Sequence, residues 1–310
     1  MVHQPVSGTM SRQENPLPQA LTDDGVRLSY ASLGEGPAVL FVHEFAGDMR
    51  SWEPQLRAFA RRHRCIVFNA RGYPPSDVPE AADAYSQARA VRDMAAVLDD
   101  AGVEQAHIVG LSMGGFATLH FGLAFPERAR SLTIAGAGYG AMGADRQAFQ
   151  AASQAAAAQF ETLGSAVYGP MYARGAARIP FLDKDARGWQ EFADALAEHD
   201  ARGAALTLRG VQARRPALDT MGESLADLRV PALIIAGDED DHSLQASLFL
   251  KRILPASGLL VLAKTGHTIN LEEPAAFNRA VLDFIAQVEA SRWLPRDPRS
   301  IGQVMPPASA

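Results

Sequence analysis

Residues 106–116 read AHIVGLSMGGF, and this stretch decides the class of fold. Its apolar run Ala106–Leu111 ends in a Gly-x-Ser-x-Gly turn around Ser112, after which the helical pattern Gly114–Phe125 begins. A residue in a sharp strand-to-helix turn needs neighbours without side chains, so that the two backbones can approach each other. The turn presents the serine hydroxyl beside a helix N-terminus, whose amides favour developing negative charge. Ser112 is therefore the predicted nucleophile.

Strand-like and helix-like runs alternate along the rest of the chain. The other short apolar runs, which predict strands, are Ala38–Val42, Cys65–Phe68, Ser131–Ala135, Ala232–Ala236 and Gly258–Leu262. Amphipathic runs that predict helices include Ala88–Asp100, Ser243–Leu254 and Ala275–Ala290. The strand runs are too apolar for strands with one solvated face, which is typical of parallel strands covered by helices on both faces. The sequence thus predicts an α/β fold with a doubly wound, mostly parallel sheet.

The alternation is interrupted between residues 139 and 228. This stretch is helical in composition, with an Ala-rich run and scattered aromatic side chains, and it shows no convincing strand. We predict a helical cap over one end of the sheet, although the Ala-rich run could instead be a low-complexity linker. Both ends of the chain lack hydrophobic periodicity. The predicted organisation is an N-terminal arm at 1–19, a core at 20–138 and 229–294, a cap at 139–228 and a C-terminal tail at 295–310.

Composition narrows the class of protein further. The chain has 310 residues, of which 47% are hydrophobic and 21% charged, and its net charge is −6, as is ordinary for a water-soluble globular protein. It shows no basic excess, no bilayer-length apolar run and no signal-peptide pattern. Its single cysteine excludes an internal disulfide framework and a Cys-rich metal site. We expect a cytoplasmic protein with a small-molecule substrate and no nucleic-acid or membrane partner; a homodimer is left open.

A serine hydroxyl needs a base, and the base needs an orienting acid. His267 follows the last strand run, and loops after strands gather at the carboxyl edge of a doubly wound sheet, where Ser112 also lies. His242, which borders an acidic loop, is the competing base. The acid is expected from that loop, Gly237–Asp241, which offers several candidates. The order serine, acid, histidine along the chain differs from the orders found in the two classes of serine protease, which are histidine, acid, serine and acid, histidine, serine.

Five motifs together carry a family resemblance. They are VHEFAG at 42–47, NARGY at 69–73, GLSMGG at 110–115, GDED at 237–240 and GH at 266–267. Over about residues 22–292 the chain resembles the α/β-hydrolase superfamily, in particular its small capped serine hydrolases of the esterase and enol-lactonase type. The resemblance implies the α/β-hydrolase fold with an inserted helical cap. It also implies Asp240 as the catalytic acid, because in the family the acid stands three residues after the glycine of its loop.

The same resemblance assigns the remaining site residues. In the family, the residue after the glycine of a His-Gly-x segment donates its backbone N–H to the oxyanion. Here that residue is Phe45, and the backbone N–H of Met113 is the second donor of the oxyanion hole. Glu44 departs from the pattern because it stands where glycine is usual. Its carboxylate either bonds backbone amides of its own loop or faces the cleft and acts on a polar substrate. The composition of the cap, and not the resemblance, suits an apolar pocket lining, and on that basis Tyr172 and Phe181 are predicted to line the substrate pocket with Glu44.

The resemblance implies hydrolysis of a small-molecule carboxylic ester or lactone through an acyl-enzyme, with no metal and no cofactor. Ser112 argues against relatives that carry aspartate at the turn, such as haloalkane dehalogenases and epoxide hydrolases. Leu111 stands where carbon–carbon hydrolases usually carry asparagine. The glycines do not follow a dinucleotide fingerprint, and no phosphate-binding loop is present. The alternatives are carbon–carbon bond or amide hydrolysis on the same triad, a ligand-binding receptor and an acyltransferase.

Arginines of the cap are a further candidate group. One of them could pair with a substrate carboxylate, but scattered arginines more often lie on solvated helix faces. The candidates are Arg174, Arg178, Arg209, Arg214 and Arg215.

Overall fold

The computed structural model describes residues 16–143 and 145–301. Within these residues an 8-stranded sheet has the order β1-β2-β4-β3-β5-β6-β7-β8. The strands are β1 (Gln19–Leu21), β2 (Arg27–Leu33), β3 (Ala38–Val42), β4 (Arg64–Phe68), β5 (Ala106–Leu111), β6 (Ala129–Ala135), β7 (Ala232–Gly237) and β8 (Ser257–Leu262). Strands β3 to β8 pair in parallel, whereas β2 pairs antiparallel with both β1 and β4. The predicted mostly parallel sheet is therefore confirmed.

All the strand runs predicted from the sequence are strands, with ends that differ by at most two residues. Strands β1 and β2 were not predicted. β1 is the edge strand and only three residues long, β2 lies between β1 and β4, and exposed side chains interrupt the apolar pattern of both. A short, half-exposed edge strand lacks the continuous apolar run by which the inner strands are recognised.

Helices cover both faces of the sheet, as its apolar strands require. One face carries α2 (Gln87–Asp100), α3 (Met113–Ala124) and α10 (Asp241–Ile253), and the other carries α1 (Glu53–Phe59) and α12 (Pro274–Glu289). Successive side chains of a strand point to opposite faces. Along β3, Leu40 and Val42 therefore pack with the first group of helices, whereas Val39 and Phe41 pack with the second.

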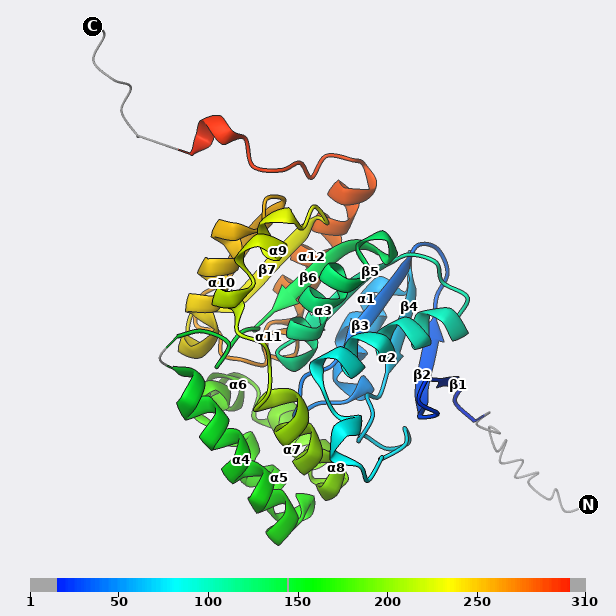
Figure 1. Cartoon of the computed structure of the whole chain (residues 1–310), viewed down its shortest axis with the longest axis vertical. Helices are drawn as coiled ribbons and strands as arrows, with labels where there is room; N and C mark the ends of the chain where they lie inside the picture. Colours follow the sequence, from blue (N-terminus) through cyan, green and yellow to red (C-terminus); the bar gives the residue numbers. More distant parts are fainter. Residues whose placement is uncertain (1–15, 144, 302–310) are drawn as a thin grey trace, which may run out of the picture.

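Between β6 and β7 the described residues form helices joined by turns and loops, and no strand. These helices are α4 (Asp145–Leu163), α5 (Ser165–Ala173), α6 (Ile179–Lys184), α7 (Ala186–Ala197), α8 (Ala201–Thr207) and α9 (Gly222–Asp227). Helices α4 to α8, here called the cap helices, gather at one end of the molecule, whereas α9 lies beside α10 (Figure 1). The predicted helical insertion is confirmed, and the exact bounds of a cap at 139–228 stay a prediction.

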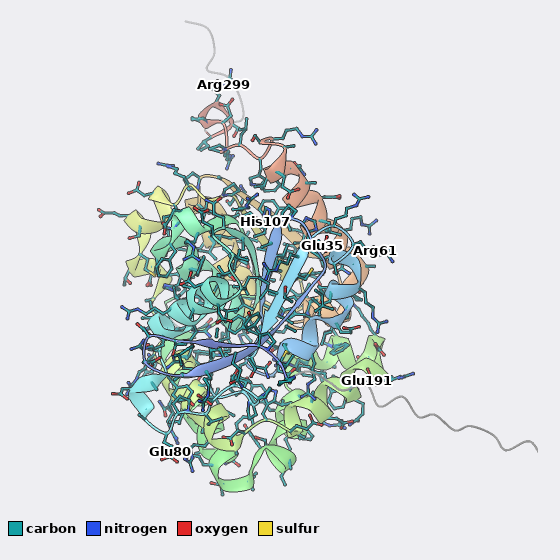
Figure 2. The ribbon with its side chains drawn as sticks, turned by 90° about the vertical axis from the view of Figure 1, so that its right-hand side faces the viewer. Glu35, Arg61, Glu80, His107, Glu191 and Arg299 are labelled. Carbon is teal, nitrogen blue, oxygen red and sulfur yellow. The ribbon has the colours of Figure 1, made fainter. Side chains whose placement is uncertain are left out.

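The cap helices lie at the edge of the sheet where the parallel strands end. Their apolar side chains share one cluster with Phe45, which follows β3, and Met113, which follows β5. In the turned view of Figure 2, Glu191 of α7 lies at this end of the molecule and Arg299 at the opposite end. The cap helices therefore cover the edge at which loops after strands converge.

The terminal segments predicted from the sequence lie partly outside the described residues. Residues 1–15 of the predicted arm and 302–310 of the predicted tail are not described, and Gln19 of the arm belongs to β1. Across 16–143 and 145–301, none of the helices is long and apolar enough to cross a membrane.

Candidate active site

Ser112 occupies the turn between β5 and α3 in a strained backbone conformation. Its φ of 55° and ψ of −113° are unusual for a residue with a side chain. A Cβ atom added to Gly110 would overlap the carbonyl group of Gly114, and one added to Gly114 would overlap the carbonyl group of Val42 at the end of β3. The two glycines thus allow the strand, the helix and the end of β3 to meet, which places Ser112 beside the loop that follows β3.

The structure brings together the three residues predicted to form a triad. Nε2 of His267 lies 2.7 Å from Oγ of Ser112, and Nδ1 of His267 lies 2.7 Å from Oδ2 of Asp240. The three side chains come from the loops after β5, β7 and β8, which meet at the covered edge of the sheet. The competing histidine, His242, instead stacks on Tyr139 with ring centroids 4.0 Å apart.

The four carboxylates of the acidic loop after β7 lie in different surroundings. Asp240 is buried and also accepts a hydrogen bond from the hydroxyl of Ser243. Asp238 accepts a backbone N–H at 3.1 Å, and Glu239 pairs with a lysine at 3.0 Å, both in the loop after β8. Asp241 is the first residue of α10. Of these carboxylates, Asp240 is the one in contact with His267.

Asp240 and His267 shift each other's pKa. Burial lowers the pKa of His267, but the charge and hydrogen bond of Asp240 outweigh burial, so the pKa of His267 is raised above 6.5. Burial raises the pKa of Asp240, but the interaction with His267 outweighs it, so the pKa of Asp240 is lowered below 3.8. An ionised Asp240 accepts the proton on Nδ1, which leaves Nε2 of His267 free to accept the hydroxyl proton of Ser112.

Two backbone amides beside Ser112 are available as donors. Within the described residues, the N–H groups of Phe45 and Met113 donate to no other protein group. The Met113 amide is at the first position of α3, where helical N–H groups have no intrahelical acceptor. Two free N–H groups, one next to Ser112 in the chain and one in the loop after β3, are the type of donor that an oxyanion requires.

The loop after β3 is held by buried polar contacts. Nε2 of His43 accepts the backbone N–H of Ala70 at 3.1 Å, so Nδ1 carries the proton and donates to the carbonyl oxygen of Glu44 at 2.7 Å. Burial lowers the pKa of His43, which favours this neutral form. The hydroxyl of Tyr73 donates to the carbonyl oxygen of Phe45 at 2.8 Å. These contacts fix the backbone that carries the Phe45 amide.

Glu44 has a partner that neither interpretation of the sequence anticipated. Its side chain is 1% exposed and forms an ion pair with Arg178, whose side chain is 9% exposed. The described residues show no bond from the Glu44 side chain to amides of its own loop, so the interpretation as a local backbone cap is wrong. The partners are 134 positions apart in the sequence, and no local pattern links them. Arg178 of the insertion therefore reaches the loop after β3 only through the tertiary fold.

The predicted pocket residues of the cap lie at different depths. Tyr172 packs on Phe45 with ring centroids 5.3 Å apart, and its ring lies 5.4 Å from the guanidinium carbon of Arg178. Phe181 is buried within the cap and packs on Phe192 at 6.2 Å. Tyr172 therefore contacts the proposed oxyanion loop, whereas the packing of Phe181 is with the cap itself.

The arginines of the cap also lie in different surroundings. Arg209 pairs with Glu161, Arg174 lies over the Trp189 ring, and Arg214 is exposed. Arg215 is buried, and burial lowers its pKa to about 9; it donates to the carbonyl oxygen of Tyr139. Arg178 is the member of this group whose charge acts on both His267 and Asp240. Over the described residues, no cluster of three or more His, Cys, Asp or Glu could hold a metal ion.

This geometry agrees with the comparison with known families. Residues 37–274 match the alpha/beta hydrolase fold family, and the chain belongs to that family.

Relatives with assigned names cover most of the chain. It is 30% identical over 277 residues to a protein of Azorhizobium caulinodans provisionally named carbamate hydrolase RutD, covering 84% of this chain and 96% of the relative. It is 28% identical to 3-oxoadipate enol-lactonase 2 of Acinetobacter baylyi, covering 84% and 94%. Among solved structures, the enol-lactonase from Burkholderia xenovorans superposes with a TM-score of 0.75 at 20% identity, covering 87% and 100%, which shows the shared fold.

Proposed function

We propose that this protein is a serine hydrolase that cleaves a small-molecule carboxylic ester or lactone through an acyl-enzyme. The observation that carries the proposal is the continuous hydrogen-bonded chain from Ser112 through His267 to Asp240. This chain supplies the nucleophile, its base and the group that orients the base. The carboxylate is buried and the imidazole is 12% exposed, so their interaction is less screened than at the surface.

The proposed reaction has two halves. His267 takes the hydroxyl proton as Ser112 attacks the substrate carbonyl, and Asp240 holds the imidazole and stabilises its protonated form. The amides of Phe45 and Met113 bind the oxyanion, and losing one such donor typically costs about 3 kcal/mol of transition-state stabilisation. His267 then protonates the leaving alcohol and activates the water that cleaves the acyl-enzyme.

The choice of ester or lactone rests on the turn and on the relatives. A serine nucleophile with two free amides suits attack on an acyl carbonyl. A relative that matches most of the chain is named as an enol-lactonase, and a lactone is a cyclic ester, so its hydrolysis is the same acyl transfer to water. Another relative is provisionally named as a carbamate hydrolase, so carbamates and amides belong in the substrate panel.

The proposal is tested by trapping the acyl-enzyme. The parent enzyme is mixed with p-nitrophenyl acetate, the burst of p-nitrophenol is measured, and the modified peptide is located by mass spectrometry. We expect a burst of about one equivalent, a transient adduct on Ser112 and turnover of esters or lactones. Ser112→Ala is the control and should give neither burst nor adduct.

The substrate panel separates the alternatives. Faster turnover of amides, carbamates or carbon–carbon substrates than of esters and lactones would contradict the proposed substrate class. A long-lived adduct with a single turnover would indicate a ligand-binding receptor. Faster transfer to an added alcohol or amine than to water would indicate an acyltransferase.

Substrate selectivity is proposed to depend on the cap. Tyr172 packs on the loop that carries the Phe45 amide, so Tyr172→Ala should change kcat/KM for bulky esters more than for p-nitrophenyl acetate. Phe181→Ala is the paired variant, because Phe181 was predicted to line the same pocket and packs inside the cap. Equal losses for every ester in both variants would exclude these two residues as selectivity determinants.

A further inference from the structure

The segment formed by residues 176–184 of the insertion lies directly against the loop that carries His267. The backbone N–H of His267 donates to the carbonyl oxygen of Ala177 at 2.7 Å. A Cβ atom added to Gly266 would overlap the same carbonyl group, so the two backbones are in close contact. The position of the proposed base thus depends on a residue of the insertion.

A second contact of the same segment reaches the neighbouring backbone amide. The buried carboxylate of Glu272 accepts the N–H of Gly266 at 2.8 Å and pairs with Lys184, the last residue of α6, at 3.0 Å. The amides of residues 266 and 267 are therefore both bound by groups that lie in segment 176–184 or are paired with it.

Arg178 links segment 176–184 to the loop after β3. It belongs to the 3₁₀ turn Ala176–Arg178, pairs with Glu44, and lies 5.6 Å from the ring of Phe192. The pair is joined through Nη2 and Oε2, while Nε of Arg178 and Oε1 of Glu44 are buried and have no partner among the described residues. A buried ion pair with unsatisfied atoms contributes little net stability, because desolvation offsets the attraction. The structural consequence of the pair is local, since it joins segment 176–184 to the loop after β3.

The two charges of the Glu44–Arg178 pair also act electrostatically on the imidazole of His267. The charged groups that act on the imidazole are Asp240, Arg178 and Glu44, and the charges of Glu272 and Lys184 lie at the adjacent amide. Arg178 lowers the pKa of His267 and Glu44 raises it, so their effects oppose each other.

We propose that Glu44 and Arg178 are positioning residues for His267. Their ion pair anchors the segment that binds the His267 backbone, and it keeps the two opposite charges beside the imidazole in balance. The inference rests on the proposed function of His267 as the base.

The test compares Glu44→Gln, Arg178→Gln and the double variant with the parent. The pKa of His267 is measured by NMR titration of its imidazole, assigned from the loss of its signal in His267→Asn, and by the acidic limb of kcat/KM for p-nitrophenyl acetate. Glu44→Gln leaves Arg178 uncompensated, so the pKa of His267 should fall by about one unit. Arg178→Gln leaves Glu44 uncompensated, so the pKa should rise by about the same amount.

The double variant separates charge from anchoring. It removes both charges, so the pKa of His267 should return to near the parent value. It also removes the anchor of segment 176–184, so kcat should stay reduced by roughly tenfold or more, with KM little changed. The double variant leaves no unpaired buried charge, and it therefore serves if a single variant does not fold.

The matched control is Glu198→Gln. Glu198 of the insertion pairs with Arg50 of the core at 2.6 Å, and both side chains are exposed. This variant breaks an ion pair between the insertion and the core that lies away from the His267 loop, so the pKa of His267 and kcat should match the parent values.

The inference is overturned if the two single variants leave the pKa of His267 unchanged or shift it in the same direction. It is also overturned if the double variant has the parent kcat. Failure of the proposed function is recognised separately, because the parent would then form no adduct on Ser112 with p-nitrophenyl acetate. The NMR titration would still report the effect of both charges on His267.

Discussion

The turn at Ser112 and the loop at His267 carry adjacent groups of one site, but they are held in different ways. Ser112 is held by contacts within the core, where Gly110 and Gly114 let β5, α3 and the end of β3 approach closely. The His267 loop is bound by core groups as well, but its His267 amide donates to the insertion, at the carbonyl oxygen of Ala177. The difference implies that substitutions at the tightly packed glycines of the first region should destabilise the fold, whereas substitutions at the contact of the second region with the insertion should lower catalysis first.

Removing the nucleophile should have the largest effect. Ser112→Ala should lower kcat/KM for esters by roughly 10⁴-fold or more, since removing a triad member leaves only binding and oxyanion stabilisation. Circular dichroism should show an unchanged fold, because the hydroxyl is not part of the packing at the turn. Residual activity above a few per cent of the parent would mean that another group attacks the substrate.

Removing the acid should be the next largest effect. Asp240→Asn should lower kcat by roughly 10³- to 10⁴-fold, because an amide no longer stabilises the correct tautomer or the charged imidazole. Asp241→Asn in the same loop is the matched control and should stay within a few-fold of the parent. If Asp241→Asn were the more damaging change, the assignment of the acid would be shifted by one residue.

A pair of glycine substitutions sharpens the comparison between the two regions. Gly114→Ala places a methyl group against the backbone of Val42 inside the core, so the free energy of unfolding should fall by about 3 kcal/mol or more. Gly266→Ala places one against the carbonyl of Ala177 in the insertion, so kcat should fall by roughly 10- to 100-fold with a smaller loss of stability.

Chemical denaturation and steady-state kinetics on both glycine variants check this expectation. Equal stability losses for the two variants would show that the insertion and the core respond as one rigid unit.

The smallest effect concerns pH. Activity requires neutral His267, so kcat/KM should fall as pH drops through its pKa, which lies above 6.5. Stability changes in the opposite sense, because a raised folded pKa stabilises the protein fully below the unfolded value, and this contribution is lost as pH rises through the folded pKa. Thermal unfolding of the parent and His267→Asn across this range should show the difference between them shrinking with rising pH. A constant difference would contradict the raised pKa.

The inner strands and the turn at Ser112 could be predicted because each depends on a pattern of a few consecutive residues. A buried parallel strand is a short continuous apolar run, and the turn at Ser112 requires glycines two positions away on each side. The loops after β7 and β8 follow such strands, so the acidic loop 237–241 and His267 could be predicted to lie near Ser112. The choice of Asp240 within that loop came from the family resemblance, and the structure places Asp240 and His267 together with Ser112. Strands β1 and β2 were missed because exposed side chains interrupt their apolar pattern, so they lack that run.

The sequence by itself therefore determined the α/β class, the helical insertion and the residues that meet at the carboxyl edge, because periodicity and motif spacing act over a few residues. Only the tertiary structure decided the partner of Glu44, the binding of the His267 amide by Ala177 and the different surroundings of Tyr172 and Phe181. These contacts join the insertion to loops of the core or pack the insertion on itself. Their partners are chosen by how the insertion folds over the sheet, which local sequence patterns do not encode.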